Sequence, residues 1–204
     1  MPAIALLSQK GGSGKTTLAI HLAVAAGDAL LLDCDRQKSA TGWWQSREAT
    51  SPEVVAAPAT QIRRAVDLGR RKWTIIDTPP QVDADARLVA QVADFVLIPT
   101  RPGILDLRAI SATVDIVTAA GKPAAIVLNA GPPGRGVSES SILTDARRAL
   151  RAYPVPVAPV SIGHRVAFAH SIADGRAASE YEPDGRAAQE ITRLWEWLRA
   201  KAST

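Results

Sequence analysis

Short runs of apolar residues alternate with helical patterns along almost the whole chain. Six of these runs have the length of a buried strand; they cover Ala3–Ser8, Ala29–Asp33, Trp73–Asp77, Phe95–Thr100, Ala124–Asn129 and Val155–Val160. Helical segments between the strands would lie over both faces of a parallel sheet and bury each strand on both sides. The pattern therefore predicts an α/β fold with a single doubly wound, mostly parallel sheet and helices on both faces.

The helical segments have recognisable apolar faces and ends. Leu18, Leu22 and Ala25 recur at helical spacing, and Gly27 is placed to end that helix. Two further helices are predicted, at about 142–151 and about 186–201. Two stretches, 39–58 and the GPPGRG sequence at 131–136, are expected to be mobile loops.

The composition fits one domain covering residues 1–204. Apolar residues make up 47% and charged residues 22% of the chain, as in ordinary globular proteins. No apolar run approaches the roughly 20 residues of a transmembrane helix, and the first apolar stretch leads into a glycine loop rather than a signal-peptide cleavage site. Cys34 is the only cysteine, which excludes a disulfide framework and a cysteine metal cage. We therefore expect a cytoplasmic protein without a transmembrane segment.

A glycine-rich sequence, KGGSGKTT at residues 10–17, lies between the first predicted strand and the first predicted helix. Its three glycines allow backbone N–H groups to turn toward phosphate oxygens without interference from a side chain. Lys15 is placed to contact the β- and γ-phosphates, and the Thr16 hydroxyl to bind Mg²⁺. The N-terminus of the following helix would add partial positive charge. The sequence therefore predicts a phosphate loop of a P-loop NTPase.

Three aspartates lie at the ends of two predicted strands. Asp33 and Asp35 occur in LLLDCDRQ at residues 30–37, and they point to the same side if the strand persists. Asp77 ends the strand in WTIIDTPP, where the two prolines prevent a helix and shape a switch loop. Because parallel sheets carry their chemistry beyond the carboxyl ends of the strands, we expect all three beside the phosphate loop. The alternative for Asp33 and Asp35 is a role as a cap or turn former, and for Asp77 it is that of a buried structural aspartate.

The sequence KGGSGKTT resembles the deviant Walker A box of the ParA/MinD family of partition and positioning ATPases, and the resemblance extends over residues 3–201. It fits the short, ParF-like ParA type, for which no N-terminal helix-turn-helix domain is expected. In that family a lysine at the position of Lys10 reaches the partner's nucleotide in an ATP-dependent homodimer. The resemblance implies ATP and Mg²⁺ as cofactors, and its implied ATP contacts are Lys10, Gly11, Gly12, Ser13, Gly14, Lys15, Thr16, Thr17 and Asn129.

The same resemblance implies roles for the aspartates. Asp35 would orient the attacking water, Asp33 would support the Mg²⁺ site, and Asp77 would hold Mg²⁺ through water. Arg36 stands where the family usually has proline, and Asn129 matches an asparagine that flanks adenine, with a plain turn role as its alternative. The implied catalytic residues are Lys10, Lys15 and Asp35, and the implied metal-binding residues are Thr16, Asp33 and Asp77.

An excess of basic residues allows the chain to bind a polyanion. It has 24 Lys and Arg against 20 Asp and Glu, a formal net charge of +4. Arg147, Arg148 and Arg151 share one predicted helix, and the resemblance places Arg165 and Arg186 near positions that contact DNA in relatives. Binding through them would be independent of sequence and sensitive to salt, and a dimer would double it. A solvated surface without a binding role is the alternative.

These features favour an ATP-dependent molecular switch. The resemblance implies that ATP produces a dimer on nucleoid DNA, and that a ParB-like or other cargo-linked adaptor stimulates hydrolysis and releases it. The cargo would be a plasmid, a chromosome or a protein body, and the protein would be cytoplasmic and nucleoid-associated. A MinD-like membrane-associated switch is the alternative, because the last predicted helix combines apolar residues with Arg193, Arg199 and Lys201.

Overall fold

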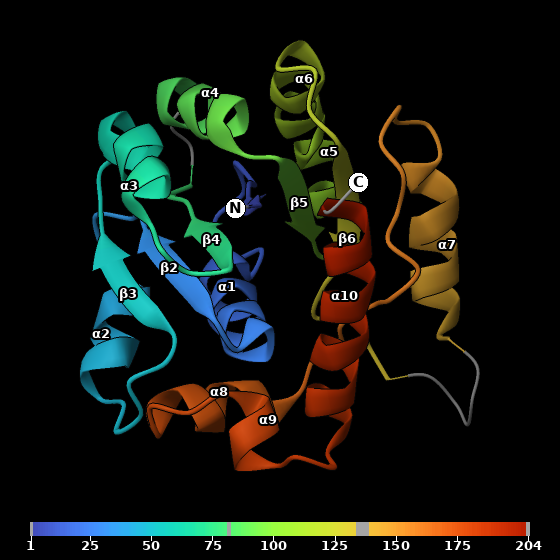
Figure 1. Cartoon of the computed structure of the whole chain (residues 1–204). Coiled ribbons are helices and arrows are strands. Elements are labelled where there is room, and N and C mark those ends of the chain that lie inside the picture. Colours follow the sequence, from blue (N-terminus) through green and yellow to red (C-terminus); the bar gives the residue numbers. More distant parts are fainter. Residues whose placement is uncertain (1, 81–82, 134–138, 203–204) are drawn as a thin grey trace.

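A parallel sheet forms the centre of the structure, a computed structural model that describes residues 2–80, 83–133 and 139–202. Within these residues the sheet has six strands in the order β3-β2-β4-β1-β5-β6, and all neighbouring strands are parallel. The strands are β1 (Ala3–Leu6), β2 (Ala29–Asp33), β3 (Glu53–Ala56), β4 (Trp73–Asp77), β5 (Phe95–Thr100) and β6 (Ala124–Leu128). Five of them match predicted strands, which confirms the α/β fold (Figure 1).

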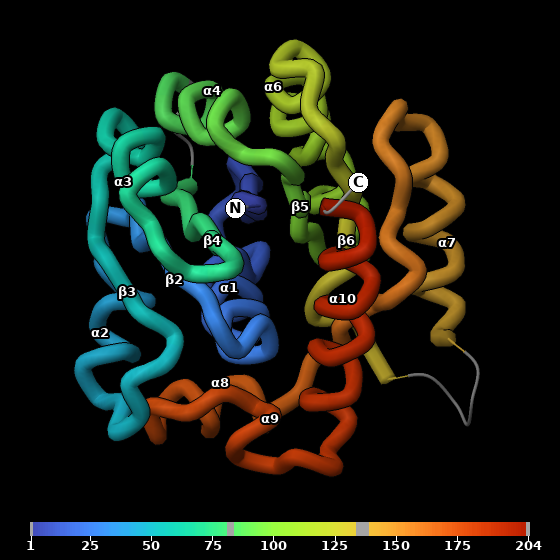
Figure 2. Tube along the Cα trace, in the orientation of Figure 1, coloured from blue at the N-terminus to red at the C-terminus, as the bar shows by residue number. Residues whose placement is uncertain are grey.

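Helices cover both faces of this sheet, as the pattern predicts (Figures 1 and 2). One face carries α1 (Lys15–Ala26), α2 (Ser39–Gln45), α8 (Val166–Ala173), α9 (Ala178–Tyr181) and α10 (Arg186–Ala202). The other carries α3 (Ile62–Leu68), α4 (Asp83–Val92), α5 (Ile104–Ala109), α6 (Ser111–Ala119) and α7 (Ser141–Leu150), with a short 3₁₀ turn, Ala59–Gln61, before α3. The sheet therefore separates two apolar cores.

Strand β1 is buried on both of its faces, which explains why the predicted strands are continuous apolar runs in the sequence. Ile4 and Leu6 belong to the core beneath α1 and α10, whereas Ala3 and Ala5 belong to the core on the opposite face. Successive side chains of a strand point to opposite faces, so a central strand between two helical layers has no solvent-facing position.

The predicted strand at 155–160 is wrong. Val157 makes one isolated parallel bridge with Ile126, and only two backbone hydrogen bonds join the segments there, Ile126 N to Pro156 O (2.8 Å) and Ala158 N to Ile126 O (2.7 Å). Pro156 and Pro159 have no N–H group to donate to a longer ladder. The segment therefore lies beside β6 without continuing the sheet.

The predicted mobile loop at 39–58 is also wrong, because it contains α2 and β3. Strand β3 pairs with β2 at the edge of the sheet, from Glu53 opposite Leu30 to Ala56 opposite Asp33. Its residues are mostly exposed, so it lacks the apolar run that marks the inner strands. Of the other expected loop, residues 134–136 lie outside the described part of the chain, and Gly131 donates its N–H to Ile162 O (2.9 Å).

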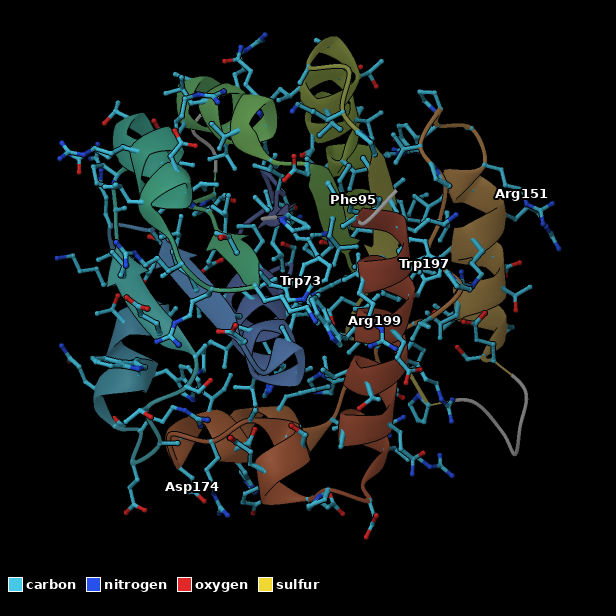
Figure 3. All side chains as sticks on the ribbon, viewed as in Figure 1. Trp73, Phe95, Arg151, Asp174, Trp197 and Arg199 are labelled. Atoms are coloured by element: carbon cyan, nitrogen blue, oxygen red, sulfur yellow. The ribbon has the colours of Figure 1, made fainter. Side chains whose placement is uncertain are left out.

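The last helix, α10, packs as an integral part of the domain. Its buried apolar residues are Ile191, Leu194, Trp195 and Leu198. Trp195 meets Trp73 edge-on with ring centroids 4.8 Å apart. Trp197 meets Phe95 edge-on with ring centroids 6.1 Å apart, and Figure 3 labels both of these residues. The apolar face of this helix is therefore covered by protein. In the described part of the chain, no helix is both long enough and apolar enough to cross a bilayer.

His21, on the buried side of α1, predicts a pH-dependent stability. Its Nδ1 accepts the N–H of Ala178 (3.2 Å), its Nε2 has no partner among the described residues, and burial lowers its pKa to about 4. A lowered pKa means that the unfolded chain binds this proton first, so stability present above about pH 6.5 is lost as the pH falls toward 4. Between pH 7.5 and 5 we expect His21 to cost about 2 kcal/mol of unfolding free energy.

Urea unfolding of the wild type and of His21→Asn at both pH values measures this cost. The asparagine retains an acceptor near the position of Nδ1 and does not titrate, and all other titrating groups are shared by the two proteins. A loss of stability that is equal in both proteins would contradict the prediction.

Candidate nucleotide site

The phosphate loop and the carboxylates meet at the carboxyl ends of three strands. Residues 7–14 follow β1, and β1 pairs with β4 so that Leu6 lies opposite Asp77. On the other side of β4, Asp33 at the end of β2 also lies opposite Asp77. Parallel pairing therefore brings Asp33 and Asp77 to the edge of the sheet where the glycine loop turns into α1, the usual location of ligand sites in such folds.

The glycines of the loop adopt the backbone geometry that a phosphate cradle needs. Gly12 has φ 72° and Gly14 has φ 92°, both in the left-handed region. Helix α1 begins at Lys15, directly after Gly14 as its N-cap, so the free N–H groups of its first turn face the loop. The predicted strand–loop–helix arrangement is present.

Lys15 and Ser13 present buried polar groups within this loop. Lys15 is 6% exposed, and burial lowers the pKa of its ammonium, while the charges of Asp77 and Asp35 raise it. The Ser13 hydroxyl is buried without a hydrogen-bond partner among the described residues. A bound phosphate would offset the desolvation of the lysine and accept from both groups.

Asp77 carries the strongest sign of a cation site. It is fully buried, and neither carboxylate oxygen has a hydrogen-bond partner among the described residues. Burial raises the pKa of Asp77 to about 7. The Thr16 hydroxyl lies close enough to lower this pKa, although the geometry between the two groups is not that of a regular hydrogen bond. A buried carboxylate without partners is costly, and Mg²⁺ bound beside Thr16 would remove that cost.

The residues present fit Mg²⁺ held jointly with a nucleotide. In the described ranges, no three His, Cys, Asp or Glu side chains are placed to hold a metal by themselves. Mg²⁺ commonly retains water and uses one or two protein oxygens together with substrate phosphates. Thr16 and Asp77 supply such oxygens next to the phosphate loop.

Asp33 lies at the end of β2, whereas Asp35 lies beyond it, and the two carboxylates have different hydrogen-bond partners. Strand β2 ends at Asp33, whose Oδ2 accepts the N–H and the hydroxyl of Thr41, both at 2.8 Å. Asp35 is half-buried and its Oδ1 accepts the N–H of Gln37 (2.9 Å). Because the strand stops before Asp35, the condition on which both carboxylates were expected to point to the same side is not met. Asp33 ties β2 to α2, a contact with Thr41 that no local sequence signal indicates.

Asp35 lines a cleft of about 710 Å³ beside the site. Its lining also includes Pro80, from the turn after β4, and Asp85, from α4. The charge of Asp35 raises the pKa of Lys15 and that of Asp77, so its carboxylate lies close enough to interact with both groups of the site.

Asn129, just after β6, contacts the phosphate loop directly. It is 7% exposed, and its Nδ2 donates to the Ser13 carbonyl at 2.8 Å. The structure therefore places it where it holds the loop in position.

Gly14→Ala is expected to damage both the loop and its ligand binding. A Cβ on Gly14 would lie 2.1 Å from Nδ2 of Asn129, and the residue would retain φ 92°. We expect a loss of about 2 kcal/mol in unfolding free energy and at least a tenfold weaker affinity for ATP, measured by denaturation and nucleotide titration. Gly11→Ala is the matched control for folding, because its Cβ meets nothing within 4 Å. Wild-type affinity in Gly14→Ala would contradict this geometry.

The Lys10 ammonium is paired with a carboxylate of its own chain. Its Nζ lies 3.6 Å from Oδ1 of Asp106 on α5, and the two side chains are 40% and 21% exposed. A partly exposed pair of this kind is worth less than about 1 kcal/mol, so Lys10 can leave it for a stronger phosphate contact.

The five arginines proposed for DNA differ in their surroundings. Arg147 donates to Glu139, Ser161 and two backbone carbonyls, and Arg165 donates to Glu190. Arg148 makes only a highly exposed pair with Asp145 (3.7 Å), and Arg186 is exposed. Arg151 extends from the end of α7 into solvent (Figure 3). Arg148, Arg151 and Arg186 are therefore the accessible ones.

Comparison with known proteins agrees with this geometry. A family model described as the CobQ/CobB/MinD/ParA nucleotide binding domain matches residues 4–178. The chain is 34% identical to the maintenance of carboxysome distribution protein A of Gloeobacter kilaueensis, with 94% of each protein covered.

Two solved structures share the fold. The septum site-determining protein MinD from Pyrococcus horikoshii, complexed with Mg-ADP, has a TM-score of 0.78 at 20% identity, covering 98% of this chain and 97% of its own. Apo McdA from Cyanothece also has a TM-score of 0.78, at 17% identity, with 100% of each chain covered. With a phosphate loop, a buried lysine and an unpaired buried aspartate at the strand ends, and a family match over most of its length, the chain belongs to the CobQ/CobB/MinD/ParA family of nucleotide-binding domains.

Proposed function

We propose that this protein is an ATPase of the ParA/MinD type that positions a cargo in the cytoplasm. The observation that carries the proposal is the buried, unpartnered Asp77 beside the buried Lys15 of the phosphate loop. This pair provides a cation for the phosphates and an anion for Mg²⁺ within one site. When bound, Mg²⁺ would neutralise charge on the terminal phosphates of ATP.

Other residues of the chain bind the phosphates, orient the attacking water, hold the loop in position and contact the second copy. Lys15 and the N–H groups around Gly12 and Gly14 bind the phosphates, and Asp35 orients the attacking water in the open cleft. Asn129 holds the loop and flanks the base. Lys10 leaves Asp106 and reaches the nucleotide of a second copy, which makes ATP part of a homodimer interface.

The proposed dimer binds DNA without sequence preference and releases it after an adaptor protein stimulates hydrolysis. Arg148, Arg151 and Arg186 support this step, because they are accessible cations of a chain with net charge +4. The relative named for carboxysome distribution favours a protein body as the cargo. A membrane-bound switch has less support, since the apolar face of α10 is buried.

Binding to random-sequence duplex DNA with ATP, with ADP and without nucleotide tests the proposal. We expect ATP-dependent binding that weakens steeply between 50 and 200 mM salt, values at which such contacts lose affinity by orders of magnitude. Arg148→Ala/Arg151→Ala should weaken it, whereas Arg63→Ala/Arg64→Ala, a matched exposed pair on α3, should not. ATP hydrolysis without DNA binding in any state would overturn the DNA step and favour a membrane or protein surface.

A further inference from the structure

Arg101 lies against the phosphate loop, although it is far from the loop in sequence. It directly follows β5, the neighbour of β1, and Leu7 at the start of the loop donates its N–H to Leu97 O of that strand (3.0 Å). Among the described residues other than Gly12 and its two chain neighbours, the only heavy atom within 4 Å of a Cβ built on Gly12 is Nη2 of Arg101, at 3.7 Å. The guanidinium therefore occupies the side of the loop where Gly12 has no side chain.

The surroundings leave this guanidinium available for a ligand. Arg101 is exposed, and among the described residues no carboxylate or other acceptor pairs with its side chain. Lys10, a partly exposed cation of this loop, is paired with Asp106. Arg147 and Arg165, by contrast with Arg101, each donate to a glutamate. Within the described part of the chain, an unpaired arginine thus lies beside a loop in which the Ser13 hydroxyl also has no hydrogen-bond partner.

We infer that Arg101 contacts the phosphate chain of the bound nucleotide and supplies it with a second cation from the same chain. The inference rests on the proposed nucleotide binding and extends it to a residue outside the glycine loop. A guanidinium can donate two parallel hydrogen bonds to a phosphate, and such charge-assisted bonds are stronger than neutral ones. Arg101 would act before any second copy arrives, at the stage when Lys10 is still held by Asp106.

Nucleotide affinity of Arg101→Gln tests the inference. We expect a fluorescent ATP analogue and its ADP counterpart to bind the variant about tenfold more weakly than the wild type, with a smaller loss in Arg101→Lys, which keeps the charge. The affinity should also depend less on salt, because one phosphate contact is removed. Arg108→Gln is the matched control, since this exposed arginine lies on α5 next to the same segment. Its affinity should equal that of the wild type.

The outcomes separate this inference from the proposed function. Wild-type affinity and salt dependence in Arg101→Gln, with an unchanged melting temperature, would overturn the role of Arg101 while nucleotide binding stands. A loss of DNA binding without a loss of nucleotide affinity would also overturn it and place Arg101 on the DNA surface. Failure of the wild-type protein to bind either nucleotide would instead refute the proposed function, and with it the inference.

Discussion

Lys15→Ala is expected to weaken ATP binding at least 100-fold. Lys15 is 6% exposed and follows a loop in which Gly12 and Gly14 adopt left-handed backbone conformations. Charge-assisted bonds from a buried ammonium to phosphate are worth about 1.5–3 kcal/mol, and about 2.8 kcal/mol corresponds to a factor of 100 in affinity. Removal also deprives Asp77 of the positive charge that lowers its pKa, which would raise the cost of ionising that carboxylate further.

Isothermal titration with ATP and Mg²⁺ measures this loss. Lys72→Ala is the matched control, because Lys72 is an exposed lysine before β4, the strand that ends in Asp77. Circular dichroism of both variants shows whether the fold is retained. Retained ATP affinity in a folded Lys15→Ala protein would refute the assignment of the phosphate loop.

Asp35→Ala is expected to retain ATP binding and to reduce turnover at least 100-fold. The carboxylate lies close enough to Asp77 for its charge to act on that residue, and it lines a cleft outside the phosphate loop, so it can orient water without being needed for affinity. Loss of a group that positions or activates the nucleophile typically costs a factor of 10² to 10⁴. If hydrolysis releases the dimer, the variant should also accumulate on DNA in the presence of ATP.

Phosphate release and DNA retention under the same conditions test this pair of effects. Asp85→Ala removes another carboxylate that lines the same cleft and should leave turnover close to that of the wild type. Unchanged hydrolysis in Asp35→Ala would remove Asp35 from the mechanism. Loss of ATP affinity in that variant would instead assign it to binding.

Features that depend on residues close together in the chain were predictable. The phosphate loop could be identified because its glycines, lysine and threonine act within eight consecutive residues between a strand and a helix. The inner strands could be identified because burial on both faces requires an unbroken apolar run. Gly27 predicted the end of α1 for an equally local reason, since its φ of 74° favours glycine.

Other features depend on contacts between distant segments. Strand β3 is held at the sheet edge by pairing with β2, and the segment at 155–160 fails as a strand because its prolines cannot extend the pairing with β6. Thr41 decides where Asp33 points.

Whether each arginine side chain is free to contact a ligand was likewise decided by the tertiary structure. Arg147 and Arg165 are held by glutamates 8 and 25 residues away, while Arg101 reaches a loop almost 90 residues before it in the chain. Composition and local pattern thus determined the class of fold and the chemistry of the loop, because both follow from short segments. Only the packing of distant segments decided which charges are paired and which remain free to bind a ligand.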